Sequence, residues 1–479
     1  MHWRSIFRLC GLLLMLFSVS FVPSAALSIW FDDGQLGVFA SSFAITLAVG
    51  LVLWLTNMRQ QAEYTVREGF LIVALFWTLV GSAGALPFLL GVHLDFTDAL
   101  FESVSGFTTT GATVIVGIEQ LPKSILYHRQ QIQWLGGMGF VVLAVAILPL
   151  LGVGGMQLYR AEISGVVKEE KITPRIAETA RALWIVYVSL TAACALCYWL
   201  AGMSGFDAVA HAFGTVSTGG YSNYDDSIWH FKSPLIEGIT IVFMVAGALN
   251  FALHFLAWKR KSLRAYASDP EARVFFSILI ACTILVAATT YGVGTYSDAL
   301  DAIRYSLFYV TSALTSTGYV SIADFPLYVP LLLIILGFIG GCAGSTSGGM
   351  KVLRIMLLAK FGQRQLFQLA HPRAVIVIKM GQRAVPEDVV YSIWGFYVLY
   401  VVTTLVLTLA MMATGLSLET AFGAVAATIN VLGPGLGDVA TTFTSVGPVA
   451  KWLAVLAMLV GRLEVFTILI LFMPAYWRR

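Results

Sequence analysis

The chain has 479 residues, of which 58% are hydrophobic and only 11% are charged. A water-soluble domain carries about 25% charged residues, so this composition excludes an ordinary soluble protein and predicts an all-α polytopic membrane protein. The net charge of +3 is too small to predict a nucleic-acid partner. The five cysteines lie in apolar or small-residue sequence, and the C-x-x-C pair Cys194 and Cys197 has no His or second Cys pair nearby, which argues against a redox or zinc site.

The first apolar run, 10–28, follows two arginines and ends in small residues, as a secretory signal does. We interpret it as a first membrane helix, because a second apolar run, 37–57, can pair with it. Further runs of bilayer-spanning length, roughly 20 residues each, cover 70–90, 132–151, 183–200, 236–257, 274–291, 389–413 and 452–473. If both termini are cytoplasmic, 23 of the 29 Lys and Arg fall in inner segments, as the positive-inside rule requires.

Four outer segments share one pattern, in which a short apolar stretch precedes a cluster of Thr, Ser and Gly. The segments are 98–114, 207–222, 301–321 and 419–437. Aligning the clusters makes Gly111, Gly219, Gly318 and Gly433 equivalent, with separations of 108, 99 and 115 residues. An acid opens each stretch, namely Asp98, Asp207, Asp301 and Glu419, and the third acid lies further from its glycine than the others. The chain therefore carries a degenerate repeat of about 100 residues.

Each repeat reads as a spanning helix, a short helix, a small-residue loop and a second spanning helix. Non-helical backbone at membrane depth must be covered by protein or must line a watery cavity. Four such loops satisfy this requirement together if they meet on one axis, where their carbonyl oxygens can replace the water around a cation. The alternative for a single cluster is a helix-packing face of small residues, but four clusters at one place in a recurring unit argue against it.

The loops "GFTTTGAT", "GTVSTGGYS", "TSALTSTGY" and "NVLGPGLG", together with "LGVGGMQLYRAE" at 151–162, resemble the Trk/Ktr/HKT potassium-transporter superfamily. The resemblance is strongest to its bacterial TrkH/TrkG type of membrane subunit. It implies four M1–P–M2 (helix–pore helix–filter loop–helix) repeats around a central pore, plus two extra N-terminal transmembrane helices. The expected divisions are 1–65 for the helix pair, then 66–165, 166–265, 266–385 and 386–479 for the repeats.

The resemblance also implies a potassium selectivity filter with one contribution from each loop. Its residues would be Thr109, Thr110, Gly111, Ser217, Thr218, Gly219, Ser316, Thr317, Gly318, Val431, Leu432 and Gly433. In this superfamily a serine in place of the first glycine is associated with sodium permeation, so glycine at all four positions favours potassium. The fourth loop departs from the others, because Val431 and Leu432 carry no hydroxyl groups and Pro434 has no N–H.

The resemblance further implies partners and a location. These are a homodimer in the bacterial inner membrane, with a pore in each protomer, and a TrkA-like cytosolic ring that binds ATP/ADP or NAD. The chain itself is expected to hold no cofactor, and K⁺ is the transported ion.

The second spanning helix of the third repeat is interrupted by "GGCAGSTSGG" at 340–349. The segment lacks the G-K-[ST] ending and the preceding strand of a phosphate-binding loop. A plain kink or packing notch stays open as an alternative. We expect an intramembrane gate below the filter, as the resemblance also implies. Its residues are Gly340, Gly341, Gly344, Ser345, Thr346, Ser347, Gly348 and Gly349.

Arg462 and Glu464 are the charged residues of the last apolar run. Charges at this depth usually face the bundle interior or a watery cavity. We expect Arg462 to lie beside the pore, where its charge opposes cation passage, and a structural ion pair is the alternative.

The sequence fits two other classes of function less well. An alternating-access, cation-coupled secondary transporter predicts inverted repeats and a midplane site, whereas these units run in one orientation with loops near the outer face. An enzyme is not expected, because no H-E-x-x-H or G-x-S-x-G motif is present.

Overall fold

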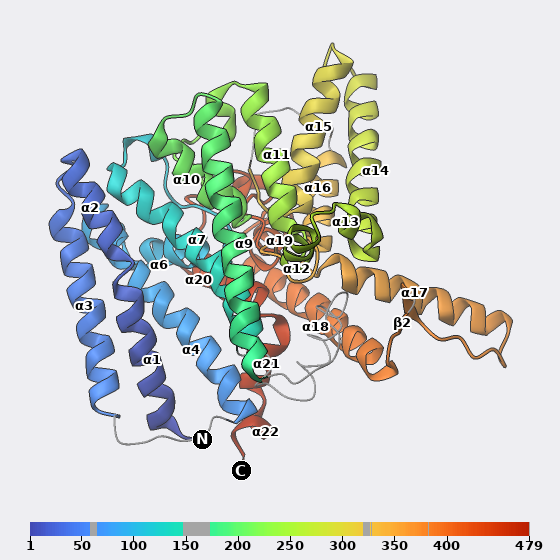
Figure 1. Cartoon of the computed structure of the whole chain (residues 1–479), viewed down its shortest axis with the longest axis horizontal. Helices are drawn as coiled ribbons and strands as arrows, with labels where there is room; N and C mark the ends of the chain where they lie inside the picture. The colour runs from blue at the N-terminus through green and yellow to red at the C-terminus, as the bar shows by residue number, and fades with distance from the viewer. Residues whose placement is uncertain (58–64, 147–172, 320–325, 327, 382, 479) are drawn as a thin grey trace.

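The computed structural model describes residues 1–57, 65–146, 173–319, 326, 328–381 and 383–478; of these, the side chains of 66, 138–146, 173–180 and 383 are not described. The motif at 151–162 therefore lies outside the described residues. Nearly all regular structure is helical, which confirms the prediction of an all-α membrane protein (Figure 1). Within the described part, the strands form one small hairpin of β1 (Lys379–Met380) and β2 (Arg383–Ala384).

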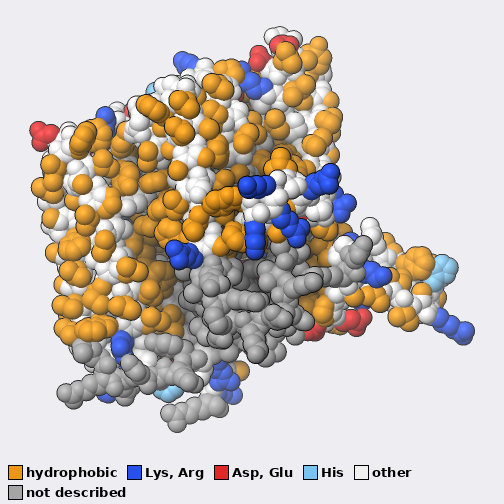
Figure 2. Space-filling model, viewed as in Figure 1, with side chains coloured by type: hydrophobic (Ala, Val, Ile, Leu, Met, Phe, Trp, Pro, Cys, Tyr) orange, Lys and Arg blue, Asp and Glu red, His pale blue; other side chains and the backbone are white. Residues whose placement is uncertain are grey.

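The apolar helices have the length that a membrane requires. Six helices of the described ranges are long and apolar enough to cross a bilayer, or up to eight if each of two bent helix pairs counts as one span. Hydrophobic side chains cover most of the face seen in Figure 2, while Lys and Arg gather near α12 and α13 and toward the lower end.

Three helices precede the repeats. They are α1 (Trp3–Ser18), α2 (Phe21–Phe31) and α3 (Leu36–Leu55). Gly11 and Gly50 face each other, and a Cβ on Gly11 would lie 2.6 Å from the Gly50 carbonyl oxygen. The two glycines therefore let the backbones of α1 and α3 touch.

The order of long helix, short helix, loop and second long helix occurs four times. The first unit contains α4 (Val66–Gly84), α5 (Leu86–Gly91), α6 (Phe96–Phe107), η1 (Ile118–Gln120) and α7 (Lys123–Ala146). The second contains α9 (Thr173–Leu200), α10 (Gly205–Val216), η3 (Ser227–Phe231), α11 (Pro234–Ala248), α12 (Phe251–Arg260) and α13 (Arg264–Ser268). The third contains α14 (Pro270–Gly292), α15 (Ala299–Leu314), α16 (Tyr328–Ile339) and α17 (Val352–Ala370). The fourth contains α18 (Glu387–Met412), α19 (Leu418–Ile429), η4 (Gly437–Val439), α20 (Pro448–Arg462), α21 (Val465–Phe472) and α22 (Pro474–Trp477).

Two of the apolar runs expected to span, 236–257 and 452–473, are each divided between two helices that meet at a bend. The α11–α12 pair bends by 100° and the α20–α21 pair by 116°. At the first bend the Asn250 side chain accepts the Ala252 N–H at 2.8 Å and so caps the start of α12. At the second, Glu464 has φ 63°, a left-handed conformation that cannot continue a helix.

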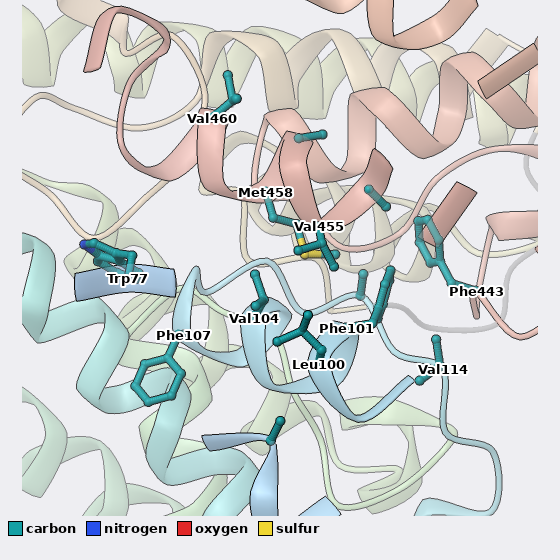
Figure 3. Close-up of a cluster of buried hydrophobic side chains, with 14 of the residues drawn as sticks. Trp77, Leu100, Phe101, Val104, Phe107, Val114, Phe443, Val455, Met458 and Val460 are labelled. Carbon is teal, nitrogen blue, oxygen red and sulfur yellow. The ribbon is translucent and has the colours of Figure 1, made fainter. Parts of the chain in front are cut away.

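A buried apolar cluster joins the first unit to the fourth. Figure 3 shows Leu100, Phe101 and Val104 of α6 facing Val455 and Met458 of α20, with Phe443 beside them. The first and last units are therefore neighbours, so the four units close on themselves rather than forming an open row.

The two chain ends lie together at one end of the molecule (Figure 1). The Trp3 and Trp477 rings stack at 6.1 Å, and Tyr476 donates a hydrogen bond to the Arg67 carbonyl oxygen at 2.6 Å. Both termini are therefore on the same side of any membrane that the bundle crosses.

Candidate functional site: a ring of four loops and the segment beneath it

The four short helices α6, α10, α15 and α19 are exposed at their N-terminal ends and buried in their C-terminal halves. Each starts at a side-chain cap, where Asp95, Ser204, Asp298 or Ser417 accepts a backbone N–H of the first turn. The predicted acids, Asp98, Asp207, Asp301 and Glu419, all lie in these first turns, as expected. All four helices therefore direct their C-termini, the negative ends of their dipoles, into the loops that follow.

The loops meet in a closed ring, in the order of the chain. A Cβ on Gly111 would lie closer than 3.0 Å to the carbonyl oxygen of Gly219, and one on Gly220 equally close to that of Thr317. A Cβ on Gly318 would meet the Leu432 carbonyl oxygen in the same way. The circle closes at Gly433, where a Cβ would lie 2.7 Å from the Thr110 carbonyl oxygen. Each loop thus packs backbone to backbone on the next, and only glycine leaves room for this contact.

The second loop is offset by one residue from the alignment made on sequence. Thr109, Thr218, Ser316 and Val431 all have positive φ, between 51° and 59°. The glycines two positions later, Gly111, Gly220, Gly318 and Gly433, have φ between 75° and 90°. The equivalent of Gly111 is therefore Gly220 rather than Gly219, and Ser217 takes the place of Thr108 at the end of its short helix. The two adjacent glycines of "STGGY" allowed both registers, and the shared Ser-Thr-Gly string favoured the wrong one.

Side chains behind the ring hold the loop carbonyls. Ser105 donates to the Ala112 carbonyl oxygen at 2.6 Å, and Ser312 donates to that of Tyr319 at 2.9 Å. In the second loop the Gln130 amide takes this role, donating to the Tyr221 carbonyl oxygen at 2.9 Å. The matching residues of the fourth unit are Ala427 and Pro434, so its loop lacks this bond.

The interrupted segment lies directly against the ring. It is non-helical from Gly340 to Lys351, between α16 and α17, which confirms the predicted break. Its hydroxyl groups bind the ends of the short helices. Thr346 donates to the Val216 carbonyl oxygen at 3.1 Å, and Ser347 donates to that of Thr315 at 2.6 Å.

The segment also contacts the fourth unit and Glu271 of α14 in its own unit. The Gly349 N–H donates to the Asn430 carbonyl oxygen at 3.1 Å, and a Cβ on Gly348 would collide with that same oxygen. The buried Glu271 carboxylate accepts the Ala343 N–H of the break at 2.7 Å and the Leu353 N–H at the start of α17 at 3.0 Å. These bonds satisfy backbone groups that have no helical partner at this depth.

Arg462 connects the segment to the first unit. Its guanidinium donates to the Thr346 carbonyl oxygen at 2.9 Å and to the Gly136 carbonyl oxygen at 3.0 Å. Glu464, two residues later, pairs with Arg354 at 2.7 Å. For Glu464 this contact is a structural ion pair between helices, one form of the alternative that the sequence left open. A cavity of about 20 Å³, lined by Ser347, Gly348, Val431, Arg354, Arg462 and Glu464, lies here and has room for little more than one water molecule.

Two residues of this region escaped the sequence reasoning. Arg129 of α7 is buried and pairs with the fully buried Glu102 of α6. The signal that was available is Glu102 itself, a carboxylate within a short apolar helix at membrane depth.

Four re-entrant loops that close one ring inside a bundle of apolar helices define a membrane protein of four pore-loop repeats. The model of the family described as "TrkH: Cation transport protein" matches residues 35–479. The Trk system potassium uptake protein TrkH of Escherichia coli strain K12 is 50% identical, with 100% of both chains covered. TrkG of the same organism is 39% identical, with 100% of this chain and 99% of TrkG covered.

The fold agrees with these relatives. The crystal structure of the potassium transporter TrkH from Vibrio parahaemolyticus matches with a TM-score of 0.93 and 48% identity, over 100% of both chains. The chain belongs to the TrkH family of cation transport proteins, which confirms the resemblance found in the sequence. The relatives are named as transport proteins and not as enzymes, as expected.

Proposed function

We propose that this protein takes up potassium across the bacterial inner membrane, through a pore whose filter is the ring of four loops. The observation that carries the proposal is the closed backbone ring itself. In it, one glycine of each loop packs against a carbonyl oxygen of the next loop, namely Gly111, Gly220, Gly318 and Gly433. Backbone oxygens held in a ring can replace the hydration shell of a dehydrated cation. The relatives named as potassium uptake proteins support K⁺ as the ion.

The filter would use three consecutive residues from each of the four predicted repeats. These are Thr109–Gly111, Ser316–Gly318 and Val431–Gly433 as aligned on sequence, and Thr218–Gly220 in the second repeat after correction of the register. Ser217 then belongs to the end of α10 rather than to the filter.

The interrupted segment 340–349 would be the gate. Its bonds to Val216, Thr315 and Asn430, and the link through Arg462 to Gly136, tie it to every unit of the ring. Ion passage would then require the segment to leave these partners. Arg462 would add an electrostatic barrier, because a buried positive charge repels a cation strongly where the effective dielectric constant is low.

The wider assembly would be a homodimer regulated by a TrkA-like cytosolic ring that binds ATP/ADP or NAD. The Trk system in the relatives' names supports further components. Both termini would face the cytoplasm, and their contact through Trp3 and Trp477 supports a shared side. The chain would hold K⁺ as its transported ion and no cofactor of its own.

The test is complementation of a bacterium that lacks its potassium uptake systems. Wild-type protein should restore growth at low potassium, and Gly111→Ser should add sodium permeability, because its side chain must displace the Gly219 carbonyl oxygen. Gly117→Ser is the matched control. Gly117 has a similar φ of 73°, but a Cβ there would meet only the Gln120 side chain, at 3.5 Å.

Failure of the wild-type protein to restore potassium-dependent growth, when it is present in the membrane, would contradict the proposed function. Equal sodium permeability in Gly111→Ser and Gly117→Ser would remove the first loop from the filter.

A further inference from the structure

A buried ion pair lies behind the junction of the first and second loops. The Glu102 carboxylate and the Arg129 guanidinium are 2.5 Å apart, and their side chains are 0% and 2% exposed. Glu102 belongs to the short helix α6 and Arg129 to the following long helix α7. A buried pair is costly to form, and it holds its geometry firmly when its remaining hydrogen bonds are satisfied.

The carboxylate holds the first loop just beyond its ring glycine. Glu102 accepts hydrogen bonds from the Thr113 hydroxyl at 3.0 Å and from the Val114 N–H at 3.1 Å. The backbone that leaves Gly111 is therefore fixed to α6 by a charged group, and hydrogen bonds to charged groups are stronger than neutral ones.

The guanidinium holds the second loop at the corresponding place. Arg129 donates to the Ser222 carbonyl oxygen at 2.8 Å and lies over the Tyr221 ring at 3.6 Å. The Tyr221 hydroxyl in turn donates to the Glu102 carbonyl oxygen at 2.8 Å. The two halves of one ion pair thus hold two different loops, and Tyr221 closes the connection between them.

In the second unit, the residue at the position equivalent to Glu102 also contacts the loop beyond its ring glycine. Glu102 stands nine residues before Gly111, and His211 stands nine residues before Gly220. The His211 ring contacts the Ser222 hydroxyl at 3.1 Å, just as Glu102 contacts the hydroxyl of Thr113. Tyr309 and Ala424 take this place in the third and fourth units, so the carboxylate is particular to the first.

We propose that Glu102 and Arg129 are positioning residues that set the ion selectivity of the ring by fixing the first loop against the second. The inference rests on the proposed function. Selection of K⁺ over Na⁺ depends on the number and field of the oxygens that an ion meets. Where the two loops are free to shift, the oxygens can close around a smaller ion.

The test measures the sodium-to-potassium permeability ratio from reversal potentials of the full-length protein in lipid bilayers. Glu102→Gln keeps the size and the hydrogen-bonding shape of the side chain but removes the charge that holds Arg129. We expect the ratio to rise about tenfold, equivalent to about 1.4 kcal/mol, with potassium current retained.

The matched control is Glu237→Gln, which removes the carboxylate from another ion pair. Glu237 contacts Arg304 at 2.6 Å and joins α11 to the N-terminal half of α15, away from the loops. This variant should keep the wild-type ratio. The double variant Glu102→Gln/Arg129→Gln leaves no unpaired buried charge, so it provides a measurement if the single variant does not fold. It should also lose selectivity.

The outcomes separate the two proposals. A wild-type protein that carries no potassium current would overturn the proposed function. A potassium-selective wild type, with folded Glu102 variants that keep its ratio, would overturn only the positioning role. A change of the ratio in Glu237→Gln as large as that in Glu102→Gln would also overturn it, because the loss of any ion pair between helices would then have the same effect.

Discussion

Gly220 is the residue at which the ring geometry makes its sharpest prediction. Its φ is 75°, and a Cβ there would lie against the Thr317 carbonyl oxygen of the third loop. At the neighbouring Gly219 an added Cβ would instead meet the Gln133 side chain, whose amide nitrogen lies 2.6 Å from the Gly219 carbonyl oxygen. We therefore expect Gly220→Ala to impair potassium transport more than Gly219→Ala.

The magnitude follows from two costs. An L-residue in the left-handed region loses roughly 1–2 kcal/mol, and overpacking against groups that cannot move away costs about 1–3 kcal/mol. Gly220→Ala incurs both, a total of about 2–5 kcal/mol. At 1.4 kcal/mol per factor of ten, the lower bound corresponds to a fall in potassium transport of about thirtyfold. Gly219→Ala displaces Gln133 and its two neutral hydrogen bonds with Gly219 and Tyr221, each worth about 0.5–1.5 kcal/mol.

The assay is ⁸⁶Rb⁺ uptake into proteoliposomes at equal protein load, with thermal unfolding measured in parallel. Gly294→Ala is the control for backbone strain alone, because Gly294 has φ 80° and nothing within 4 Å of an added Cβ. It should lose a little stability and no uptake. If Gly219→Ala abolished uptake while Gly220→Ala transported normally, the backbone register of the second loop would be refuted.

Two further predictions concern the segment beneath the ring. Arg462→Gln removes charge-assisted hydrogen bonds to Thr346 and Gly136, each worth about 1.5–3 kcal/mol, so uptake without the regulator should rise about tenfold or more; exposed Arg273 supplies the control Arg273→Gln. Deletion of residues within 344–348 removes the bonds to the short helices and should also raise unregulated uptake, measured in the same vesicles. Unchanged or lower uptake in either folded variant would return that element to a structural role.

The sequence was sufficient for the features that repeat along the chain. Four short helices with an acid in the first turn, a glycine-containing loop after each, and a break after Ile339 follow from composition and spacing alone. These features are local, because a small-residue loop between apolar runs has few conformations open to it in a membrane. The longer interval between acid and glycine in the third unit also has a counterpart in the structure, since α15 spans 16 residues and α6 only 12.

The features that escaped prediction depend on contacts that the hydropathy of a single segment does not record. The bends at Asn250 and Glu464 leave hydropathy unchanged, because a bent apolar segment has the same composition as a straight one. The register of the second loop is decided by which glycine faces Thr317 of the third. The pairing of Glu102 with Arg129 joins residues 27 positions apart on different helices. None of these can be read from the hydropathy of one segment by itself.

The ring is nearer to twofold than to fourfold in its supporting bonds. In the first loop the hydroxyl groups of Thr108 and Thr110 are 2.7 Å apart, and the pair Thr315 and Thr317 repeats this distance in the third. The second and fourth loops have Gly219 and Leu432 at the later position, so neither can form the pair. The second loop is compensated by Gln130, Gln133 and Arg129 from the first unit. The fourth rests on Tyr400, which donates to the Asn430 side chain at 2.6 Å, and on the segment beneath it. The Gly349 N–H also binds the Asn430 carbonyl oxygen. Movement of the segment 340–349 would therefore displace the fourth loop first, because this loop has the fewest supporting bonds of its own.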